Sequence, residues 1–346
     1  MDEVALARRL IQAADEARDQ HPARALQRAL CARDFAASLD VGESEALDHE
    51  TWSDLQSDAW AALGSAHRST ADLQAAESCL QVALTFLEAR AEADPRRRAR
   101  LAQRAAYVRS DQGRFDEALD LLADARTLYV DLGEAQKAAC ARVDRALVLK
   151  RSGRPQAAIE ELSASLETLD REAEPRSYLA AVHNMAHALL ETAADEAEEN
   201  EALRWLELAF EEHGRRPAAL NVLRLRAVAA LTASRLGRPS HGLAELRRLA
   251  DEFARLGAAE DQALALLHTA ELTLSAEDVE PAERASEVLR LSGRLFPLMA
   301  RLPLDEDAHE ALLGLMAGAR RRELTVDAVR RAARLVEKSV QKQKAG

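Results

Sequence analysis

The segment from Trp60 to Ala83 constrains the fold of this chain more than any other. Large and small residues alternate there at fixed offsets, in the order Trp60, Leu63, Gly64, His67, Ala76, Leu80 and Ala83. Helices that cross closely need small residues at the contact and large ones beside it. The spacing therefore predicts two packed α-helices that touch where the glycine and the two alanines lie.

The same pattern of small residues returns along the chain. The first small position of the second helix recurs at 76, 118, 158, 202 and 242, with separations of 42, 40, 44 and 40 residues. The segments Gly113–Leu119 and Gly153–Ile159 are matching turns that lead into a helix. A repeat of this length predicts a solenoid, in which each helical pair stacks on the next.

Proline positions support the helix boundaries. Six prolines fall near expected helix starts, namely Pro95, Pro155, Pro175, Pro217, Pro239 and Pro281. Proline is tolerated in the first turn of a helix, because the amide hydrogen that it lacks has no partner there. We also expect Asp94 to cap the helix that begins at Pro95.

These offsets resemble the tetratricopeptide repeat (TPR) family. The chain looks like bacterial TPR regions that follow helix-turn-helix or kinase domains in regulatory proteins. The matching residues are Gly113–Leu122, Ala180–Ala186, Asn221–Arg226 and Arg322–Leu335. The resemblance implies an all-α, right-handed TPR-like α-solenoid of about seven or eight helical hairpins with 40–44-residue repeats. The chain departs from the family pattern at Ala227 and Ala230, where relatives tend to carry Trp and Gly.

We expect one superhelical domain over residues 1–346. It would comprise an N-terminal hairpin at 2–38, better-formed repeats at 46–256 and degenerate C-terminal hairpins at 258–346, with about sixteen helices in all.

Composition limits the classes of partner. The chain is 48% hydrophobic but 3% aromatic, so its core must consist of alanine and leucine. A net charge of −12 argues against direct binding to nucleic acid or an anionic membrane. No apolar run approaches the roughly 20 residues of a membrane helix, and the N-terminus lacks a signal-peptide core. The three cysteines form no ligand motif, so we expect reduced thiols in a cytoplasmic protein.

No catalytic motif is present in the sequence. GxGxxG, GxxxxGK[ST], GxSxG and HExxH are all absent, so we expect no enzyme activity and no cofactor. His183 and His187 are four residues apart and would share one face of a helix. No third ligand accompanies them, and we therefore expect no metal site.

The TPR register instead suggests a surface for a protein or peptide partner. In TPR proteins the open positions of each first helix line the concave face, and here these positions hold Arg104, Tyr107, His183, Asn184, His187 and Arg224. The same register places Gln103 and Asp144 on this face. The alternative interpretation is that these are ordinary polar residues with no ligand.

An arginine run is a second candidate surface. Arg96, Arg97, Arg98 and Arg100 offer donors for phosphate or for an acidic partner. Solvated side chains at the start of a helix are the alternative.

The sequence therefore favours a non-enzymatic scaffold or adaptor that binds a protein segment in its concave groove and regulates a separately encoded effector. The alternative is a peptide-sensing TPR regulator that resembles bacterial quorum-sensing receptors but lacks a DNA-binding domain. The partner's identity and the oligomeric state stay open.

Overall fold

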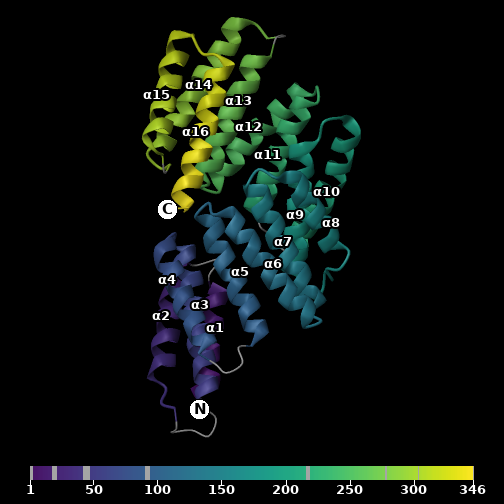
Figure 1. Cartoon of the computed structure of the whole chain (residues 1–346). Helices are drawn as coiled ribbons and strands as arrows, with labels where there is room; N and C mark the ends of the chain where they lie inside the picture. Colours follow the sequence, from purple (N-terminus) through teal and green to yellow (C-terminus); the bar gives the residue numbers. More distant parts are fainter. Residues whose placement is uncertain are drawn as a thin grey trace. The chain divides into compact units, whose positions relative to one another are not determined.

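The computed structural model describes residues 3–17, 22–41, 47–89, 94–215, 219–276, 279–302 and 304–345. These residues form sixteen α-helices and no β-strand (Figure 1). The all-α prediction and the expected number of helices are confirmed. The predicted boundary at residue 46 and Pro217 lie outside the described residues.

The chain divides into two compact units. Unit 1 comprises Met1–Arg154, Ala164–Glu174 and Lys344–Gly346, and unit 2 comprises Pro155–Ser163 and Pro175–Gln343. The first seven helices belong to unit 1: α1 (Glu3–Ala17), α2 (Pro22–Ser38), α3 (His49–Ser69), α4 (Leu73–Glu88), α5 (Pro95–Asp111), α6 (Phe115–Asp131) and α7 (Ala135–Arg151). The single domain over the whole chain stays a prediction.

Helix α8 (Pro155–Leu166) contributes residues to both units. The remaining helices belong to unit 2, apart from the last residues of the chain: α9 (Pro175–Thr192), α10 (Glu196–Arg215), α11 (Ala219–Arg235), α12 (Pro239–Arg255), α13 (Ala259–Ser275), α14 (Pro281–Met299), α15 (Glu306–Arg321) and α16 (Val326–Ala345).

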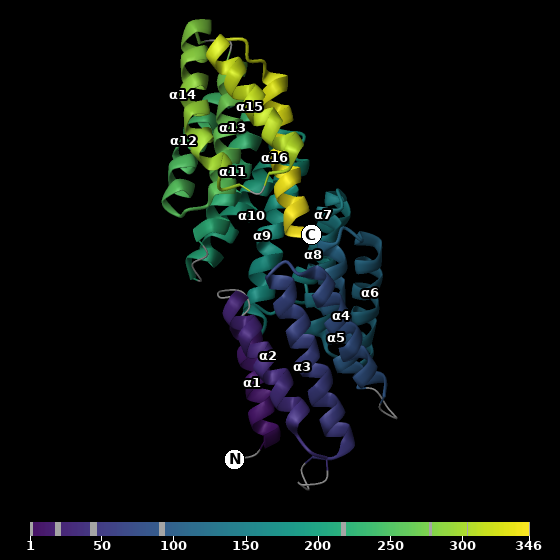
Figure 2. The same cartoon turned by 90° about the vertical axis from the view of Figure 1, so that its left-hand side faces the viewer.

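Within each unit, helices that follow one another in the chain pack side by side. Helices α3 and α4, α5 and α6, and α11 and α12 form such hairpins, and the second helix of one pair also contacts the first helix of the next, as α4 contacts α5 (Figures 1 and 2). The predicted hairpin repeats are therefore present.

The matching turns have one conformation. Gly113 and Gly153 both have φ of 76°, in the left-handed region that glycine adopts without steric cost. In both turns the next amide bonds back across the helix end, from Arg114 N to Arg109 O at 2.8 Å and from Arg154 N to Leu149 O at 2.9 Å. This left-handed glycine ends one helix and starts the next.

Helix starts follow the proline and capping predictions. Asp94 accepts a hydrogen bond from Arg96 N at 2.9 Å, with Pro95 in the first turn of α5. Helices α8, α9, α12 and α14 also begin at a proline. One proline, Pro297, lies inside a helix, in the last turn of α14.

The core consists of the small residues that the repeat pattern indicates. Ala76, Ala118, Ala158 and Ala202 each have 0% exposure, and Gly242 is buried as well. Leucine supplies most of the larger buried side chains, with Tyr129 and Phe253 as the aromatic exceptions. Small residues at these positions let the helix axes approach closely.

Gly64 lies at such a crossing. A Cβ atom there would lie 3.0 Å from Leu80 Cγ and 3.1 Å from the carbonyl oxygen of Ala76. The prediction of a close contact between α3 and α4 at Gly64 and Ala76 is confirmed.

Candidate functional site

The six predicted contact residues are divided between the units. Arg104 and Tyr107 lie on α5 in unit 1, whereas α9 and α11 in unit 2 carry the other four. The six residues therefore form two sets, one in each unit, and one groove that includes all six stays a prediction.

Arg104, on α5, is held by two other helices of unit 1. Its guanidinium binds both carboxylate oxygens of Asp15 on α1, at 3.2 and 2.7 Å. It also donates to the Ala61 carbonyl and to Ser65 Oγ on α3, each at 2.9 Å. The side chain is 22% exposed. Arg104 thus ties α5 to α1 and α3, and its planar donor fork is fixed in position.

Tyr107 belongs to a chain of hydrogen bonds around Asp144 on α7. Tyr107 donates to the Asp144 carboxylate, and Gln103 Nε2 donates to Asp144 Oδ2 at 2.8 Å. Tyr129 on α6 donates in turn to Gln103 Oε1 at 2.9 Å. On α3, the guanidinium of Arg68 lies 5.3 Å from the Tyr107 ring centroid, a cation–π contact.

Burial shifts two pKa values in this cluster. Desolvation raises the pKa of Asp144 to about 6, although the hydrogen bonds from Tyr107 and Gln103 oppose the shift. Burial likewise raises the pKa of Tyr129 to about 12, which keeps its hydroxyl a donor.

Two further arginines of unit 1 share one carboxylate. Asp111 on α5 accepts from Arg68 on α3 and from Arg151 on α7, each at 2.7 Å. Arg151 also donates to Ser110 Oγ at 2.9 Å. We refer to these polar side chains together as the unit 1 polar network; its members are Asp15, Arg68, Gln103, Arg104, Tyr107, Asp111, Asp144 and Arg151.

Sequence reasoning singled out Gln103, Arg104, Tyr107 and Asp144 of this network but missed Asp15, Arg68, Asp111 and Arg151. A signal for the arginines was present in the sequence. Arg68 and Arg151 lie 43 and 40 residues from Asp111, close to the repeat length. Residues one repeat apart occupy equivalent places on stacked helices, so opposite charges at that interval predict an ion pair between repeats.

The three predicted residues on α9 differ in exposure. His183 and His187 are half-buried, and His187 Nδ1 lies 3.7 Å from Glu191 Oε2. Asn184 is 8% exposed, and its amide donates to the Ala180 carbonyl one turn earlier, at 2.9 Å. The expectation of an open Asn184 side chain is wrong, because that position of α9 faces the packed interior.

Arg224 joins two helices of unit 2. Its guanidinium binds both oxygens of Asp261 on α13, at 2.7 and 2.9 Å, and its side chain stays 43% exposed. The hydrogen bond to Asp261 raises the pKa of Arg224, despite partial burial.

The arginine run at the start of α5 is largely paired within unit 1. Arg96 binds Glu134, Arg97 contacts Asp54, Asp58 and Asp94, and Arg100 lies 3.7 Å from Asp58. Arg98 is exposed. Arg96, Arg97 and Arg100 therefore serve contacts between helices of unit 1, and binding of an external anion by this patch stays a prediction.

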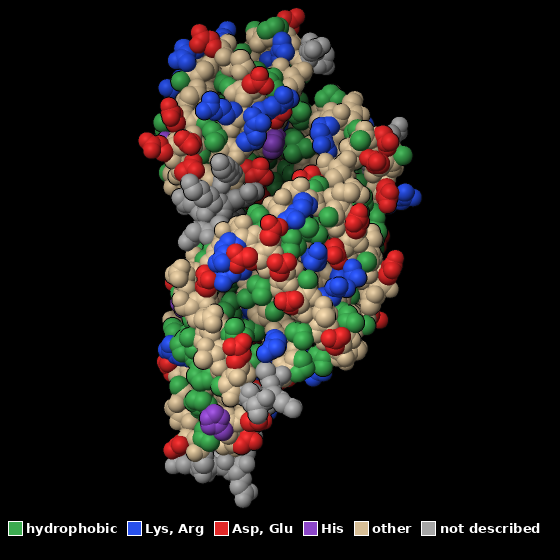
Figure 3. Space-filling model, viewed as in Figure 1, with side chains coloured by type: hydrophobic (Ala, Val, Ile, Leu, Met, Phe, Trp, Pro, Cys, Tyr) green, Lys and Arg blue, Asp and Glu red, His purple; other side chains and the backbone are tan. Residues whose placement is uncertain are grey.

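The visible surface shows the same mixing of charge. Acidic and basic side chains are interspersed over the face seen in Figure 3. Such a surface is typical of paired charges between helices, and it presents no broad basic face in this view.

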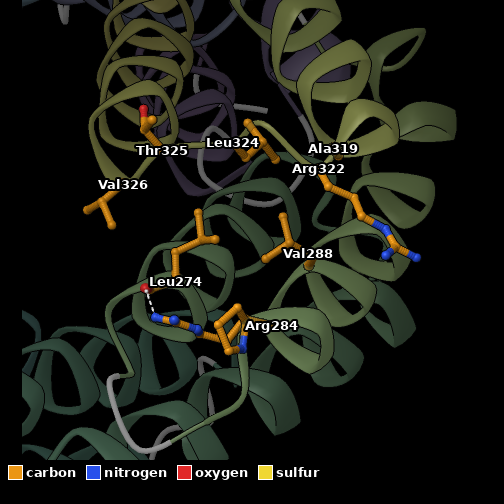
Figure 4. A pocket seen from close by; sticks show the side chains of 10 residues that line it. Leu274, Arg284, Val288, Ala319, Arg322, Leu324, Thr325 and Val326 are labelled. Carbon is orange, nitrogen blue, oxygen red and sulfur yellow. Dashed lines mark hydrogen bonds between the residues drawn. The ribbon is translucent and has the colours of Figure 1, made fainter.

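Unit 2 contains a pocket that the sequence did not indicate. It has a volume of about 310 Å³ and lies between α13, α14 and the turn from α15 to α16. Leu274, Val288 and Leu324 form its apolar wall, and Arg284 donates to the Leu274 carbonyl at 3.1 Å (Figure 4). Arg322, in a left-handed conformation with φ of 59°, lies at its edge.

The described residues contain neither a metal-binding cluster nor a helix fit to span a membrane. No group of three or more His, Cys, Asp or Glu side chains there is placed to hold a metal ion. In the same residues, no helix has the length and apolar character needed to cross a membrane.

Known structures resemble the fold at low sequence identity. A Rap protein complexed with competence and sporulation factor matches with a TM-score of 0.59 and 12% identity, over 99% of this chain and 98% of that one. Aspartyl phosphate phosphatase F from Bacillus subtilis matches with a TM-score of 0.58 and 9% identity, over 82% and 68%.

A Rap conjugation gene regulator of the plasmid pLS20, in complex with the Phr* peptide, matches with a TM-score of 0.52 and 10% identity, over 97% and 98% of the two chains. No protein-family model and no curated protein matches the sequence. The structural likeness establishes the fold, which is a TPR-like repeat of helical hairpins.

Proposed function

Because the chain has the TPR-like repeat fold, we propose that it is a non-enzymatic scaffold or adaptor that binds a protein segment through the first helices of its repeats and regulates a separately encoded effector. TPR-like solenoids present extended surfaces built from equivalent positions of successive repeats. The proposal includes a cytoplasmic location, which the three thiols Cys31, Cys79 and Cys140 favour.

The observation that carries the proposal is the unit 1 polar network. Arg104 and Tyr107 are half-buried, and each is fixed by contacts to helices other than its own. Side chains held in this way lose little conformational entropy when a ligand binds, which favours affinity. They also retain donors, since Arg104 has five N–H groups and a tyrosine ring can stack.

The non-enzymatic assignment rests on the residues of this chain. One structural neighbour carries the name of a phosphatase, so the fold alone is compatible with more than one activity. Here the half-buried carboxylate of raised pKa, Asp144, is enclosed by Tyr107 and Gln103. The hydrogen bonds from these two side chains hold the Asp144 carboxylate within the network.

A peptide sensor is the second candidate. Two neighbours are described in complex with a peptide or with competence and sporulation factor. In that case a short peptide, rather than a segment of a folded partner, would occupy the same face and shift a conformational equilibrium.

Site-specific photo-crosslinking in the native host tests the binding face. A benzoylphenylalanine at Tyr107 or His187 should label one and the same partner. The control position is Val130, which is 56% exposed on α6. The proposal would be contradicted if Val130 labelled the partner equally well, or if neither Tyr107 nor His187 labelled it. Labelling by a peptide of a few residues, rather than by a protein, would favour the sensor.

A further inference from the structure

A groove in unit 1 lies between α4, α5 and α6. Its volume is about 330 Å³, and its floor is apolar, formed by Leu80, Leu84, Leu101, Ala105, Leu121 and Leu128. Leu84, Leu121 and Leu128 are half-buried rather than enclosed. The space stays open because α5 presents the small side chains Ala102 and Ala105 between the leucines of its two neighbours.

This groove is separate from the face of the proposed function. Successive residues of a helix are rotated by about 100°, so Ala105 and Tyr107 point in nearly opposite directions from α5. Ala105 lines the groove, whereas Tyr107 belongs to the unit 1 polar network. Neither Arg104 nor Tyr107 is among the residues that line the groove.

The rim of the groove is acidic on both long sides. Glu88 on α4 and Asp124 on α6 are exposed lining residues. Asp120 and Asp131 are also exposed and continue the edge of α6, because they lie four and seven residues from Asp124. Within the described residues, no ion pair of 4.0 Å or less neutralises Glu88 or Asp124.

The basic residues of the rim are fewer. Arg109 at one end is paired with Glu77, which leaves the exposed Arg98 as the other cation of the lining. A ligand with apolar groups in the middle and cations along both sides would match this pattern of charge.

The dimensions fit a helix. The α4 side extends from Glu77 to Glu88, which corresponds to about 16 Å, or three helical turns. A cavity of 150 Å³ holds one benzene-sized group, so this volume holds about two aliphatic side chains. A helix of three turns presents two or three such side chains on one face, at positions i, i+3 or i+4, and i+7.

We propose that this groove binds an amphipathic helix of a partner protein, about three turns long, whose aliphatic stripe is flanked by lysine or arginine. The leucines of the groove take the stripe, and Glu88 and Asp124 bind the flanking cations. This is helix-in-groove recognition, in which burial of the apolar face gives affinity and the charged rim sets orientation.

Fluorescence anisotropy at 0.15 M salt tests the proposal with a defined probe. The probe is a labelled 14-residue helical peptide of leucine and lysine, with the leucines on one face. Glu88→Lys combined with Asp124→Lys should weaken its binding tenfold or more. Leu84→Gln combined with Leu128→Gln should do the same, with circular dichroism to confirm that the variant is folded.

The matched control changes the same charge elsewhere. Glu160→Lys combined with Glu283→Lys alters two exposed carboxylates of unit 2, and it should leave probe binding within twofold of the unmodified protein. An equal loss in the control pair would overturn the proposal, since the peptide would then respond to net charge alone. Unchanged binding in the Glu88/Asp124 pair would overturn it as well.

A second peptide tests the charge complementarity. With glutamate in place of lysine and the same leucines, it should bind at least tenfold more weakly than the lysine peptide. If it binds equally well, the acidic rim plays no part and the proposed partner chemistry is wrong. These outcomes are independent of crosslinking at Tyr107 and His187, so this proposal and the proposed function fail separately.

Discussion

The crossing of α3 and α4 in unit 1 and the crossing of α11 and α12 in unit 2 meet the same packing requirement with opposite helices. In the first, the glycine is Gly64 on the first helix, and it faces Ala76 on the second. In the second, Ala230 is on the first helix and Gly242 on the second. Both pairs are twelve residues apart, so the register is the same and only the glycine has moved.

This exchange explains one departure from the family pattern. Relatives in the family that the sequence resembles tend to have glycine at the position of Ala230. Gly242 restores the close approach from the other helix, because a Cβ there would overlap the Ala230 carbonyl oxygen. The requirement for a small residue thus belongs to the pair of helices rather than to either one.

The units also differ in how they hold an aspartate on a first helix. In unit 1, Asp144 is held by neutral donors, Tyr107 and Gln103. In unit 2, Asp261 is paired with Arg224. Burial disfavours the ionised form of Asp144, and its hydrogen bonds and the charge of Arg68 offset this only in part.

The largest effect should come from Gly242→Ala. The new Cβ would lie well inside 3.0 Å of both Ser234 Oγ and the Ala230 carbonyl oxygen. The serine hydroxyl can rotate, but the backbone oxygen cannot, so the helices must separate. We expect a loss of about 3 kcal/mol of stability, at the upper end for overpacking. Urea denaturation followed by circular dichroism measures it.

Adding Ala230→Gly to that variant copies the arrangement of the α3/α4 crossing. If one glycine per crossing suffices, the double variant should recover part of the lost stability. No recovery would mean that the glycine is required on α12 itself.

Gly64→Leu should be the next most damaging change. Its Cβ would meet Leu80 Cγ at 3.0 Å and the Ala76 carbonyl oxygen at 3.1 Å, a milder conflict than at Gly242. The larger side chain should cost about 1–3 kcal/mol. Gly64→Ala should cost less than Gly242→Ala, because both gain about 1 kcal/mol in helix propensity but the steric conflict is milder at Gly64. If Gly64→Ala lost more stability than Gly242→Ala, the α3/α4 crossing would be the tighter of the two.

Asp144→Asn should stabilise the protein at pH 7 to 8 by about 1 kcal/mol. The folded pKa of about 6 exceeds the ordinary value of 3.8, so the folded state takes up this proton first as pH falls. Stability from this group is therefore present below about pH 4 and is lost as pH rises through 6. A pKa shift of two units corresponds to a loss of roughly 3 kcal/mol of stability when Asp144 is ionised. Asparagine avoids this loss but also lacks the charge-assisted hydrogen bonds of the carboxylate, so the net gain is smaller.

Melting curves of both proteins between pH 4 and 8 measure this effect. The two should converge at the acidic end, separate between pH 4 and 6, and differ by a constant amount above pH 6. A constant difference at all pH values would show that Asp144 does not titrate in that range.

Arg224→Ala should have the smallest effect, a loss of about 0.5–1 kcal/mol. The pair with Asp261 has excellent geometry, but Arg224 is 43% exposed, and solvent weakens such pairs. Arg224→Lys should fall between alanine and the unmodified protein, because lysine keeps the charge but cannot bind both oxygens in one plane. A thermal shift assay measures all three, and a loss above 2 kcal/mol would show that the pair behaves as a buried one.

Much of the fold could be predicted because its signals are local. The successful predictions depend on neighbours within about one hairpin. They are the interval between Gly64 and Ala76, the left-handed glycines at 113 and 153, and the proline at the start of α5. Pro297 was the local feature that the boundary argument overlooked. It lies in the last turn of α14, so although the helix loses the hydrogen bond of one amide, only Leu298 and Met299 follow it in the helix.

The candidate site was less predictable because exposure depends on distant residues. The register placed Arg104, Tyr107, Asn184 and Arg224 on one type of helix face, but it did not indicate what each side chain would meet. Arg104 binds Asp15, which is 89 residues away, and Arg224 binds Asp261, 37 residues away. Asn184 faces inward instead. A one-dimensional pattern gives the face of a helix but not the neighbour that covers it.

The sequence by itself determined that the chain is helical, where its helices turn, and which small residues lie at the crossings, since helical period and backbone preference act over a few residues. Only the tertiary structure decided how the charges are paired, that Gly242 replaces the glycine missing at Ala230, and that α4, α5 and α6 leave a groove open. Those features depend on the summed volumes and charges of helices that are brought together from different repeats. How these helices pack depends on all of them together, so no single segment of the sequence predicts it.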